Sequence, residues 1–262
     1  MLIGKRPMRR VAKSIFQIRH YLSFIHSFTV YKTPVRNIFR YFFNKGKYPY
    51  RIELLTRSGE ESIMLNSSHD LLTVNEIFCR EDYGREKNAR VIVDIGSNIG
   101  ISALYFLTQN PKSRLYLFEP LPVNVTQIRT NLKKFEGRYV LEECCIYKFT
   151  GEVSFHKEST GRYGGISHQP TTIPLPSIIR VPCKDINEIL ESILRKERQI
   201  DILKIDIEGE ELTLLYEIKQ EYLSRIKKIY IECMNQPLFY LAGFNSRKYG
   251  DIHIYERKKD DK

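Results

Sequence analysis

Several features that would place this sequence of 262 residues in a simple class are missing from it. It contains five cysteines, an odd number, and none of them has Cys-x-x-Cys spacing. Neither a disulfide framework nor a zinc site is therefore indicated, and the sequence predicts reduced, buried thiols and no metal. Cysteine usage of this kind is typical of a reducing compartment, so we expect a cytoplasmic protein.

A long uninterrupted apolar run is also missing. Lys13, Arg19 and His20 break the N-terminal stretch, whereas a membrane span needs about 18 consecutive apolar residues. No small-residue cleavage site follows that would mark a signal peptide. The apolar positions instead recur in steps of four and three, at Val11, Ile15, Ile18, Leu22 and Ile25, with Phe24 and Phe28 beside them. This periodicity predicts an amphipathic helix over residues 8–31, followed by a shorter helix over 33–46.

Acidic residues are absent from the first 52 positions. Twelve Lys and Arg residues precede Glu53, and the rest of the chain holds 30 basic (42 − 12) and 31 acidic side chains, so the net charge of +11 belongs to the N-terminal segment. We therefore predict a basic helical segment over residues 1–48 and a catalytic domain over 49–262. Residues 8–43 could contact an anionic membrane surface, pack on the domain with solvated charges, or bind an acidic partner. Nucleic acid is the least favoured partner, because the positive charge is confined to this segment.

A glycine-spaced turn is the most informative pattern. The apolar run at 91–95 ends in this turn, and a helical pattern follows, which predicts a buried strand, a tight turn and a helix N-terminus that can approach a polar cofactor. A dinucleotide fingerprint requires glycines where this chain has Gly96, Asn98 and Ile101, so a nicotinamide oxidoreductase is disfavoured. Asp94, just before the turn, suits a ligand with a cationic, amino-acid-like end, such as S-adenosylmethionine.

Two further strands are predicted to end in charged residues. Residues 114–118 form a buried strand that leads into Glu119, and an acid at the tip of the second strand of a βαβ unit typically holds ribose hydroxyls. Lys204, Asp206 and Glu208 alternate along another apolar strand. Charges inside a buried strand are costly unless they are paired, so this cluster predicts either a site at the carboxyl end of the strand or a structural ion-pair cluster.

Three motifs together resemble the FkbM family of S-adenosylmethionine-dependent methyltransferases. They are Asp94-Ile-Gly96-Ser97-Asn98-Ile-Gly100, Phe118-Glu119-Pro120 with Asn124, and Lys204-Ile-Asp206-Ile-Glu208-Gly209-Glu210. The resemblance covers roughly residues 70–256. It implies an α/β fold of the class I methyltransferase (Rossmann-like) type, with a seven-stranded, mostly parallel sheet, helices on both faces and an antiparallel final strand.

The resemblance also implies which residues hold S-adenosylmethionine. Asp94, Gly96, Ser97, Asn98 and Gly100 would surround its methionine part, Glu119 would bind the ribose, and Asn124 would form the neighbouring wall. The family implies methyl transfer to a hydroxyl-bearing acceptor, a glycan, glycolipid or related metabolite. One departure is Met234, which stands where such proteins often carry a histidine two residues after the acid of the fifth strand.

The chemistry of methyl transfer indicates a catalytic base. A sugar hydroxyl is a poor nucleophile and benefits from a carboxylate that accepts its proton. Asp206 or Glu208 is the predicted base, with Lys204 pairing or tuning them. Two alternatives stay open: a methyltransferase that acts on nucleic acid, and a non-catalytic adapter that retains the fold.

Overall fold

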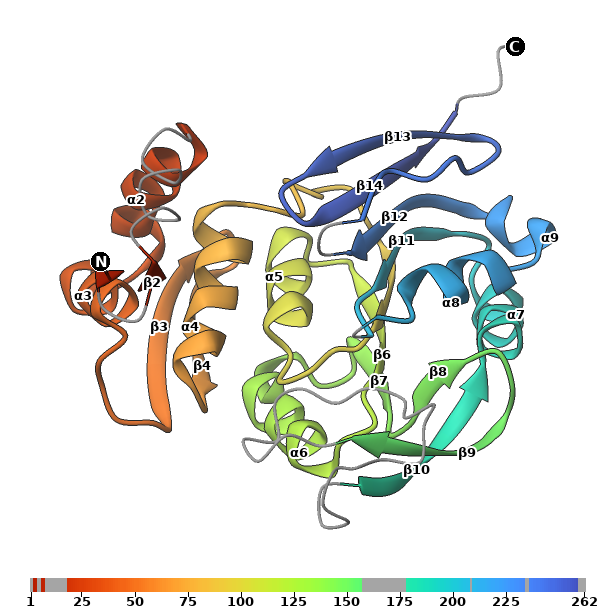
Figure 1. Cartoon of the computed structure of the whole chain (residues 1–262), viewed down its shortest axis with the longest axis horizontal. Helices are drawn as coiled ribbons and strands as arrows, with labels where there is room; N and C mark the ends of the chain where they lie inside the picture. Colours follow the sequence, from red (N-terminus) through yellow and green to blue (C-terminus); the bar gives the residue numbers. More distant parts are fainter. Residues whose placement is uncertain are drawn as a thin grey trace. The chain divides into compact units, whose positions relative to one another are not determined.

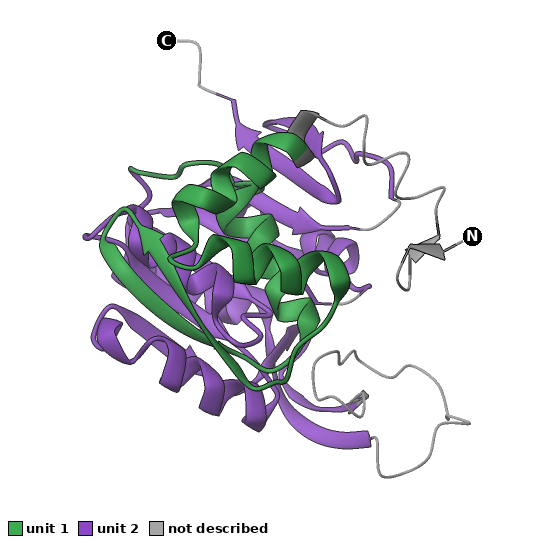
Figure 2. Cartoon of the chain, turned by 90° about the vertical axis from the view of Figure 1, so that its left-hand side faces the viewer, with its two compact units in different colours: residues 1–87 green, residues 88–262 purple. Residues whose placement is uncertain are grey.

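The chain forms two compact units, residues 1–87 and 88–262, which Figure 2 colours separately. The computed structural model describes residues 2–3, 6–7, 18–156, 178–207, 209–233 and 236–258. The division into units falls later in the chain than the predicted division near residue 48, because a β-hairpin and a short helix pack with the N-terminal helices. The division into units describes which residues pack together and does not test where the catalytic domain begins. The predicted domain limits at 1–48 and 49–262 therefore stay a prediction.

The first unit consists of short helices and a hairpin. Its elements are β1 (Leu2–Ile3), β2 (Arg6–Pro7), α2 (Ile18–Val30), α3 (Pro34–Phe43), β3 (Tyr50–Thr56), β4 (Gly59–Leu65), α4 (Ser68–Val74) and the π-helical turn η1 (Asn75–Cys79). The two predicted helices are confirmed over their described residues, with Pro34 in the first turn of α3. The left-handed residue that ends α3 is Asn44, two positions before the predicted stop at Gly46. Residues 8–17 of the first predicted helix lie outside the described residues.

The second unit is built on a seven-stranded sheet of order β13-β14-β12-β11-β5-β6-β7. The strands are β5 (Val91–Ile95), β6 (Arg114–Phe118), β7 (Tyr139–Glu142), β11 (Ile200–Ile205), β12 (Ile226–Glu232), β13 (Phe244–Tyr249) and β14 (Ile252–Arg257). The five strands from β12 to β7 pair in parallel, and β14 is antiparallel to both of its neighbours. The predicted mostly parallel sheet with an antiparallel final strand is confirmed. The edge strand β13 was not predicted.

Helices cover both faces of this sheet, as predicted (Figure 1). One face carries α5 (Ile101–Gln109) and α6 (Pro122–Asn131), and the other carries α7 (Ile186–Lys196) and α8 (Glu211–Glu217). The short elements η2 (Lys133–Phe135) and α9 (Gln220–Leu223) complete the unit. Since the connections from β5 lead to β6 on one side and the chain later returns to β11 on the other, the strand order reverses at β5. Ligands of open α/β sheets bind beyond the carboxyl ends of the strands at such a point.

A second, three-stranded sheet of order β8-β10-β9 lies beside the first. It consists of β8 (Cys145–Tyr147), β9 (Gly151–His156) and β10 (Ile178–Asp185). Residues 139–147 do not form one continuous strand, because the chain leaves the main sheet after Glu142. The physical reason is visible in the packing of two adjacent thiols: Cys144 belongs to the core of the main sheet, whereas Cys145 belongs to the core of the second sheet.

Candidate functional site

A cleft in the second unit lies at the carboxyl ends of β5 and β6. It is lined by Ile95, Gly96, Asn98, Phe118, Glu119, Pro120, Leu121, Asn124, Cys144, Cys145, Ile146, Phe155, Asp206 and Ile207. These residues come from the glycine turn, the end of β6, the start of α6, the second sheet and the end of β11. Four of the predicted cofactor residues therefore line one cleft, together with one predicted catalytic residue.

The glycine turn is fixed by a close approach of two strands. Gly96 has a φ of +79°, and a Cβ atom at that position would lie 1.8 Å from the backbone oxygen of Asp206. No side chain fits there, so the end of β11 can meet the turn only because residue 96 is glycine. Gly100 has a φ of +86° and precedes the first residue of α5, which explains the second glycine of the motif.

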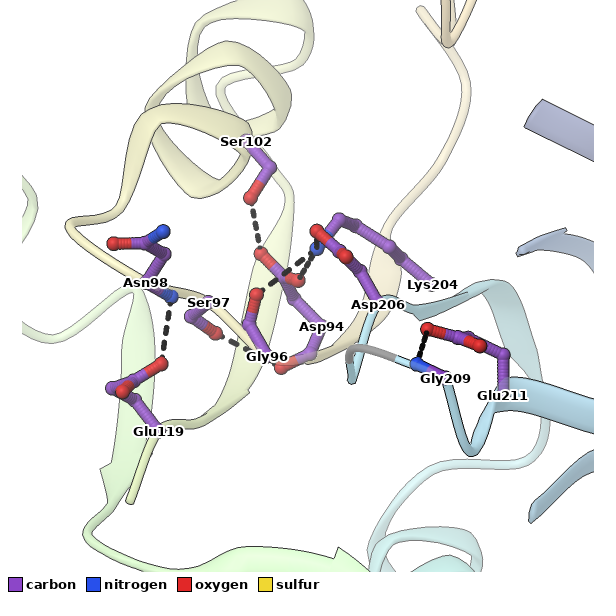
Figure 3. Close-up of polar contacts among 10 residues, drawn as sticks. All are labelled: Asp94, Gly96, Ser97, Asn98, Ser102, Glu119, Lys204, Asp206, Gly209 and Glu211. Atoms are coloured by element: carbon purple, nitrogen blue, oxygen red, sulfur yellow. Dashed lines mark hydrogen bonds and ion pairs between the residues drawn. The ribbon is translucent and has the colours of Figure 1, made fainter. Parts of the chain in front are cut away.

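A buried ion-pair cluster lies beneath the turn (Figure 3). Lys204 donates from Nζ to Oδ1 of Asp94 at 2.9 Å and to the backbone oxygen of Gly96 at 3.1 Å, and lies 3.3 Å from Oδ2 of Asp206. The other oxygen of Asp94 accepts a hydrogen bond of 2.6 Å from Ser102 Oγ. Both carboxylate oxygens of Asp94 are thus engaged by the protein, and Asp94 does not line the cleft. It supports the turn from below.

The surrounding carboxylates raise the pKa of Lys204. Burial by itself would lower the pKa of the Lys204 ammonium, but the carboxylates of Asp94, Asp206 and Glu232 outweigh it and raise the pKa. Of the two interpretations of the charged strand, a structural ion pair therefore describes the contact between Asp94 and Lys204. Asp206 differs from Asp94, since its side chain is 30% exposed and reaches the cleft.

Glu119 presents a second buried carboxylate, and it faces the cleft. Its oxygens accept hydrogen bonds from the backbone N–H of Asn98 at 2.9 Å, the backbone N–H of Leu121 at 3.1 Å and Nδ2 of Asn124 at 3.1 Å. These donors lower its pKa, but burial dominates and raises the pKa of Glu119 to about 7. Glu119 is thus a carboxylate with no lysine or arginine partner among the described residues.

The turn residues between these carboxylates have different roles. Asn98 has a φ of +50°, and its Oδ1 is buried without a hydrogen-bond partner among the described residues. An orphaned acceptor beside a cleft indicates a ligand that donates a hydrogen bond there. Ser97, by contrast, donates from Oγ to the backbone oxygen of Asp94 at 2.9 Å and does not line the cleft. It stabilises the turn.

Much of the cleft lining is apolar. Phe118, Leu121, Ile146 and Phe155 contribute to it, together with the adjacent thiols of residues 144 and 145. Residues 144–146 thus all lie in the cleft. Burial raises the pKa of the Cys144 thiol to about 12, and all five cysteines are free and buried, in agreement with the prediction of reduced thiols.

Two buried polar residues near the same sheet edge were missed. His253, in β14, is fully buried, with Nε2 3.2 Å from the backbone oxygen of Gln236 and Nδ1 unpartnered among the described residues. Burial lowers its pKa. Glu211 accepts a hydrogen bond of 2.8 Å from the backbone N–H of Gly209. The only sequence signal for His253 was a lone histidine within an apolar strand. Glu211 belongs to a run of four residues, 208–211, of which three are acidic. Glu208, a predicted base, lies outside the described residues.

The sequence is similar to known methyltransferases. The sequence model of the methyltransferase FkbM domain matches residues 94–251, which include the turn, Glu119 and the Lys204 cluster. The 2-O-methyltransferase NoeI of Sinorhizobium fredii is 28% identical over 167 residues, which make up 59% of this chain and 67% of that protein. The 31-O-demethyl-FK506 methyltransferase FkbM of Streptomyces tacrolimicus is 23% identical over 209 residues, 67% of this chain and 78% of that protein.

Other matches differ in extent. The AMB antimetabolite synthetase AmbE of Pseudomonas aeruginosa is 24% identical over 217 residues, which cover 69% of this chain but 10% of that protein, so this chain corresponds to a small part of it. Among solved structures, a methyltransferase FkbM from Methylobacillus flagellatus has a TM-score of 0.43 and 15% identity, covering 72% of this chain and 54% of that chain.

Proposed function

The chain belongs to the FkbM family of methyltransferases, and from that premise we propose that it binds S-adenosylmethionine in the cleft and methylates a hydroxyl group. The observation that carries the proposal is Glu119, a buried carboxylate that faces the cleft without a cationic partner among the described residues. A carboxylate at this strand end can accept hydrogen bonds from both hydroxyls of a ribose.

The other residues of the cleft fit the same cofactor. The unpartnered Oδ1 of Asn98 can accept a hydrogen bond from the ammonium group of the methionine part. The apolar wall of Phe118, Leu121 and Ile146 suits an adenine ring. Gly96 keeps the turn narrow, and Ser97 and Asp94 hold it in place from behind. When bound, this cofactor supplies an electrophilic methyl group on a positively charged sulfur.

We assign proton acceptance to the carboxylates at the end of β11. Asp206 lines the cleft, and its Oδ2 lies 3.3 Å from Lys204 Nζ, which holds the side chain in position. An ionised carboxylate at this place can take the proton of an acceptor hydroxyl as the new bond to carbon forms. Glu208 remains the alternative base, and Lys204 acts as a positioning residue.

Two relatives support oxygen as the acceptor atom: one is a 2-O-methyltransferase and the other a 31-O-demethyl-FK506 methyltransferase. We propose a sugar hydroxyl of a glycan or glycolipid as the acceptor, because the three sequence motifs resemble those of the FkbM family. The free, buried cysteines favour a reducing compartment, so we propose that the protein works in the cytoplasm.

The test is transfer of labelled methyl from S-adenosylmethionine into a host extract separated into lipid-glycan, protein, nucleic-acid and small-molecule fractions. The proposal predicts label in the glycan-containing fraction, and label in nucleic acid would overturn the sugar acceptor. Asp206→Asn and Glu208→Gln test the base, with Glu221→Gln, an exposed carboxylate of α9, as the matched control. Wild-type turnover in both variants would reject a base at the end of β11.

A further inference from the structure

Helices α2 and α3 of the first unit are packed with their apolar sides outward. In α2 the buried positions include Ser23 and Ser27, and in α3 the buried position is Asn37. Ser23 donates to Asn75 Oδ1 at 2.8 Å, and Asn37 accepts from Tyr50 OH at 2.9 Å, so small polar groups satisfy one another inside the unit. The large apolar residues therefore point away from the unit's own core, the reverse of an ordinary amphipathic helix.

The outward residues form one aromatic face, which we define as Phe24, Phe28, Phe39, Phe42 and Phe43. The ring centroids of Phe24 and Phe42, from different helices, are 6.4 Å apart, and those of Phe39 and Phe43 are 4.5 Å apart. Nine of the 16 exposed large hydrophobic side chains among the described residues lie between positions 21 and 43. A contiguous apolar patch of this kind marks an interaction surface.

The charge around the aromatic face is of one sign. No acidic residue occurs before Glu53. Arg36, Lys45 and Lys47 are exposed, and Arg36 and Lys45 line a hollow together with Phe39. Lys45 also lines the groove between the aromatic side chains. Glu53 and Glu60 do lie near this region, but both contact Lys32. A partner that covers the aromatic face must therefore offer apolar contact in the middle and negative charge around it.

We propose that the aromatic face docks on an anionic lipid bilayer, with α2 and α3 lying in the plane of the membrane interface. Phenylalanine side chains insert at the boundary of headgroups and acyl chains, and each nearby Lys or Arg adds attraction to acidic lipids. Among the described residues no helix is long and apolar enough to cross a membrane. A second copy of the chain is less suited, because it would bring like charges together. The proposal is independent of the methyltransferase acceptor.

The experiment is sedimentation of the full chain with vesicles of phosphatidylcholine, with and without phosphatidylglycerol. Wild type should bind the anionic vesicles and release them as salt is raised. Phe42→Ser/Phe43→Ser should lose at least about tenfold in affinity, because the apolar insertion is removed. Lys45→Gln/Lys47→Gln should lose about 20-fold for anionic vesicles and nothing for neutral ones. Tyr240→Ser, which removes an aromatic side chain that is 80% exposed in the second unit, is the matched control and should bind like wild type.

Each outcome decides the proposal. Wild-type binding to anionic vesicles that both double variants weaken, with unchanged circular dichroism and cofactor affinity, supports it. Absence of vesicle binding overturns it, whether the chain is a monomer or forms a dimer that Phe42→Ser/Phe43→Ser dissociates. Equal binding by wild type and Phe42→Ser/Phe43→Ser also overturns it, since the aromatic face would then have no part in the contact.

Discussion

Asp94 and Glu119 end neighbouring strands of one sheet, and both carboxylates are buried, but their surroundings differ. Asp94 has its two oxygens occupied by Lys204 and Ser102 and does not line the cleft. Glu119 receives only uncharged donors, lines the cleft, and has a pKa raised to about 7. The charge of Asp94 is balanced by a lysine of the protein, whereas Glu119 faces the cleft without such a partner among the described residues. Carboxylates near the ends of two adjacent strands thus differ in surroundings: Asp94 supports the turn, and Glu119 is the one that we propose binds the cofactor.

The strongest perturbation of the turn is Gly96→Ala. The new Cβ would meet the backbone oxygen of Asp206 at 1.8 Å, and a backbone atom cannot move away as a side chain end can. We expect the free energy of unfolding to fall by about 3 kcal/mol or more, with loss of measurable cofactor binding. Gly137→Ala is the control, because Gly137 has a similar φ of +83° with no atom within 4 Å of the added Cβ, and we expect a fall of about 1 kcal/mol. Equal effects in the two variants, measured by denaturant unfolding, would contradict this account.

Lys204→Met tests the claim that Asp94 is a structural carboxylate. The substitution leaves Asp94 buried with Ser102 as its remaining side-chain partner, and we expect a loss of about 3 kcal/mol in the free energy of unfolding. Lys228→Met removes a lysine from a more exposed pair with Glu256 and should change stability by less than about 1 kcal/mol. Adding Asp94→Asn to Lys204→Met should recover part of the loss. If the double variant is no more stable than Lys204→Met, the pair does not stabilise the turn as described.

Glu119→Gln tests whether the Glu119 carboxylate binds the cofactor. The amide presents one acceptor oxygen where the carboxylate had two, so we expect cofactor affinity to fall about 100-fold in calorimetric titration. Glu142→Gln alters a carboxylate at the end of the next strand, β7, which does not line the cleft, and affinity should be unchanged. Similar affinities for the two variants would show that Glu119 does not bind the cofactor.

The pKa of Glu119 gives a smaller, pH-dependent effect. Ribose hydroxyls donate to the ionised carboxylate, so binding competes with protonation, and affinity should fall about tenfold for each pH unit below the pKa of about 7. In the cofactor-free chain the stability contributed by Glu119 changes with pH in the opposite direction to the cofactor affinity. The folded-state pKa is raised above 4.5, so the contribution of Glu119 to stability is present below pH 4.5 and is lost as the pH rises through 7. Glu119→Gln should remove both dependences, and a flat affinity profile in wild type would contradict the assignment.

The sequence allowed the sheet and the cleft to be predicted because their signals are local. Apolar runs such as 91–95 and a glycine turn that requires positive φ leave few alternatives. The edge strand β13 was missed because only Phe244 of its six residues is buried, so it has no apolar pattern. The break after Glu142 depends on which core each of two adjacent thiols enters, which no local pattern records.

Two features depended on pairings that are distant in sequence. The distinction between Asp94 and Glu119 rests on Lys204, which is 110 residues from Asp94, so the motif alone assigned both carboxylates to the cofactor. Periodicity located the apolar stripe of the N-terminal helix but could not say which side of the helix packs. Burial of Ser23 and Ser27 shows that the polar side does.

The most direct test of the central claim is a crystal structure of the chain with S-adenosylhomocysteine. We expect the ribose hydroxyls to lie within hydrogen-bond distance of the Glu119 carboxylate, while Asp94 keeps its contacts with Lys204 and Ser102 and does not touch the ligand. A ligand bound through Asp94, or bound away from Glu119, would contradict it.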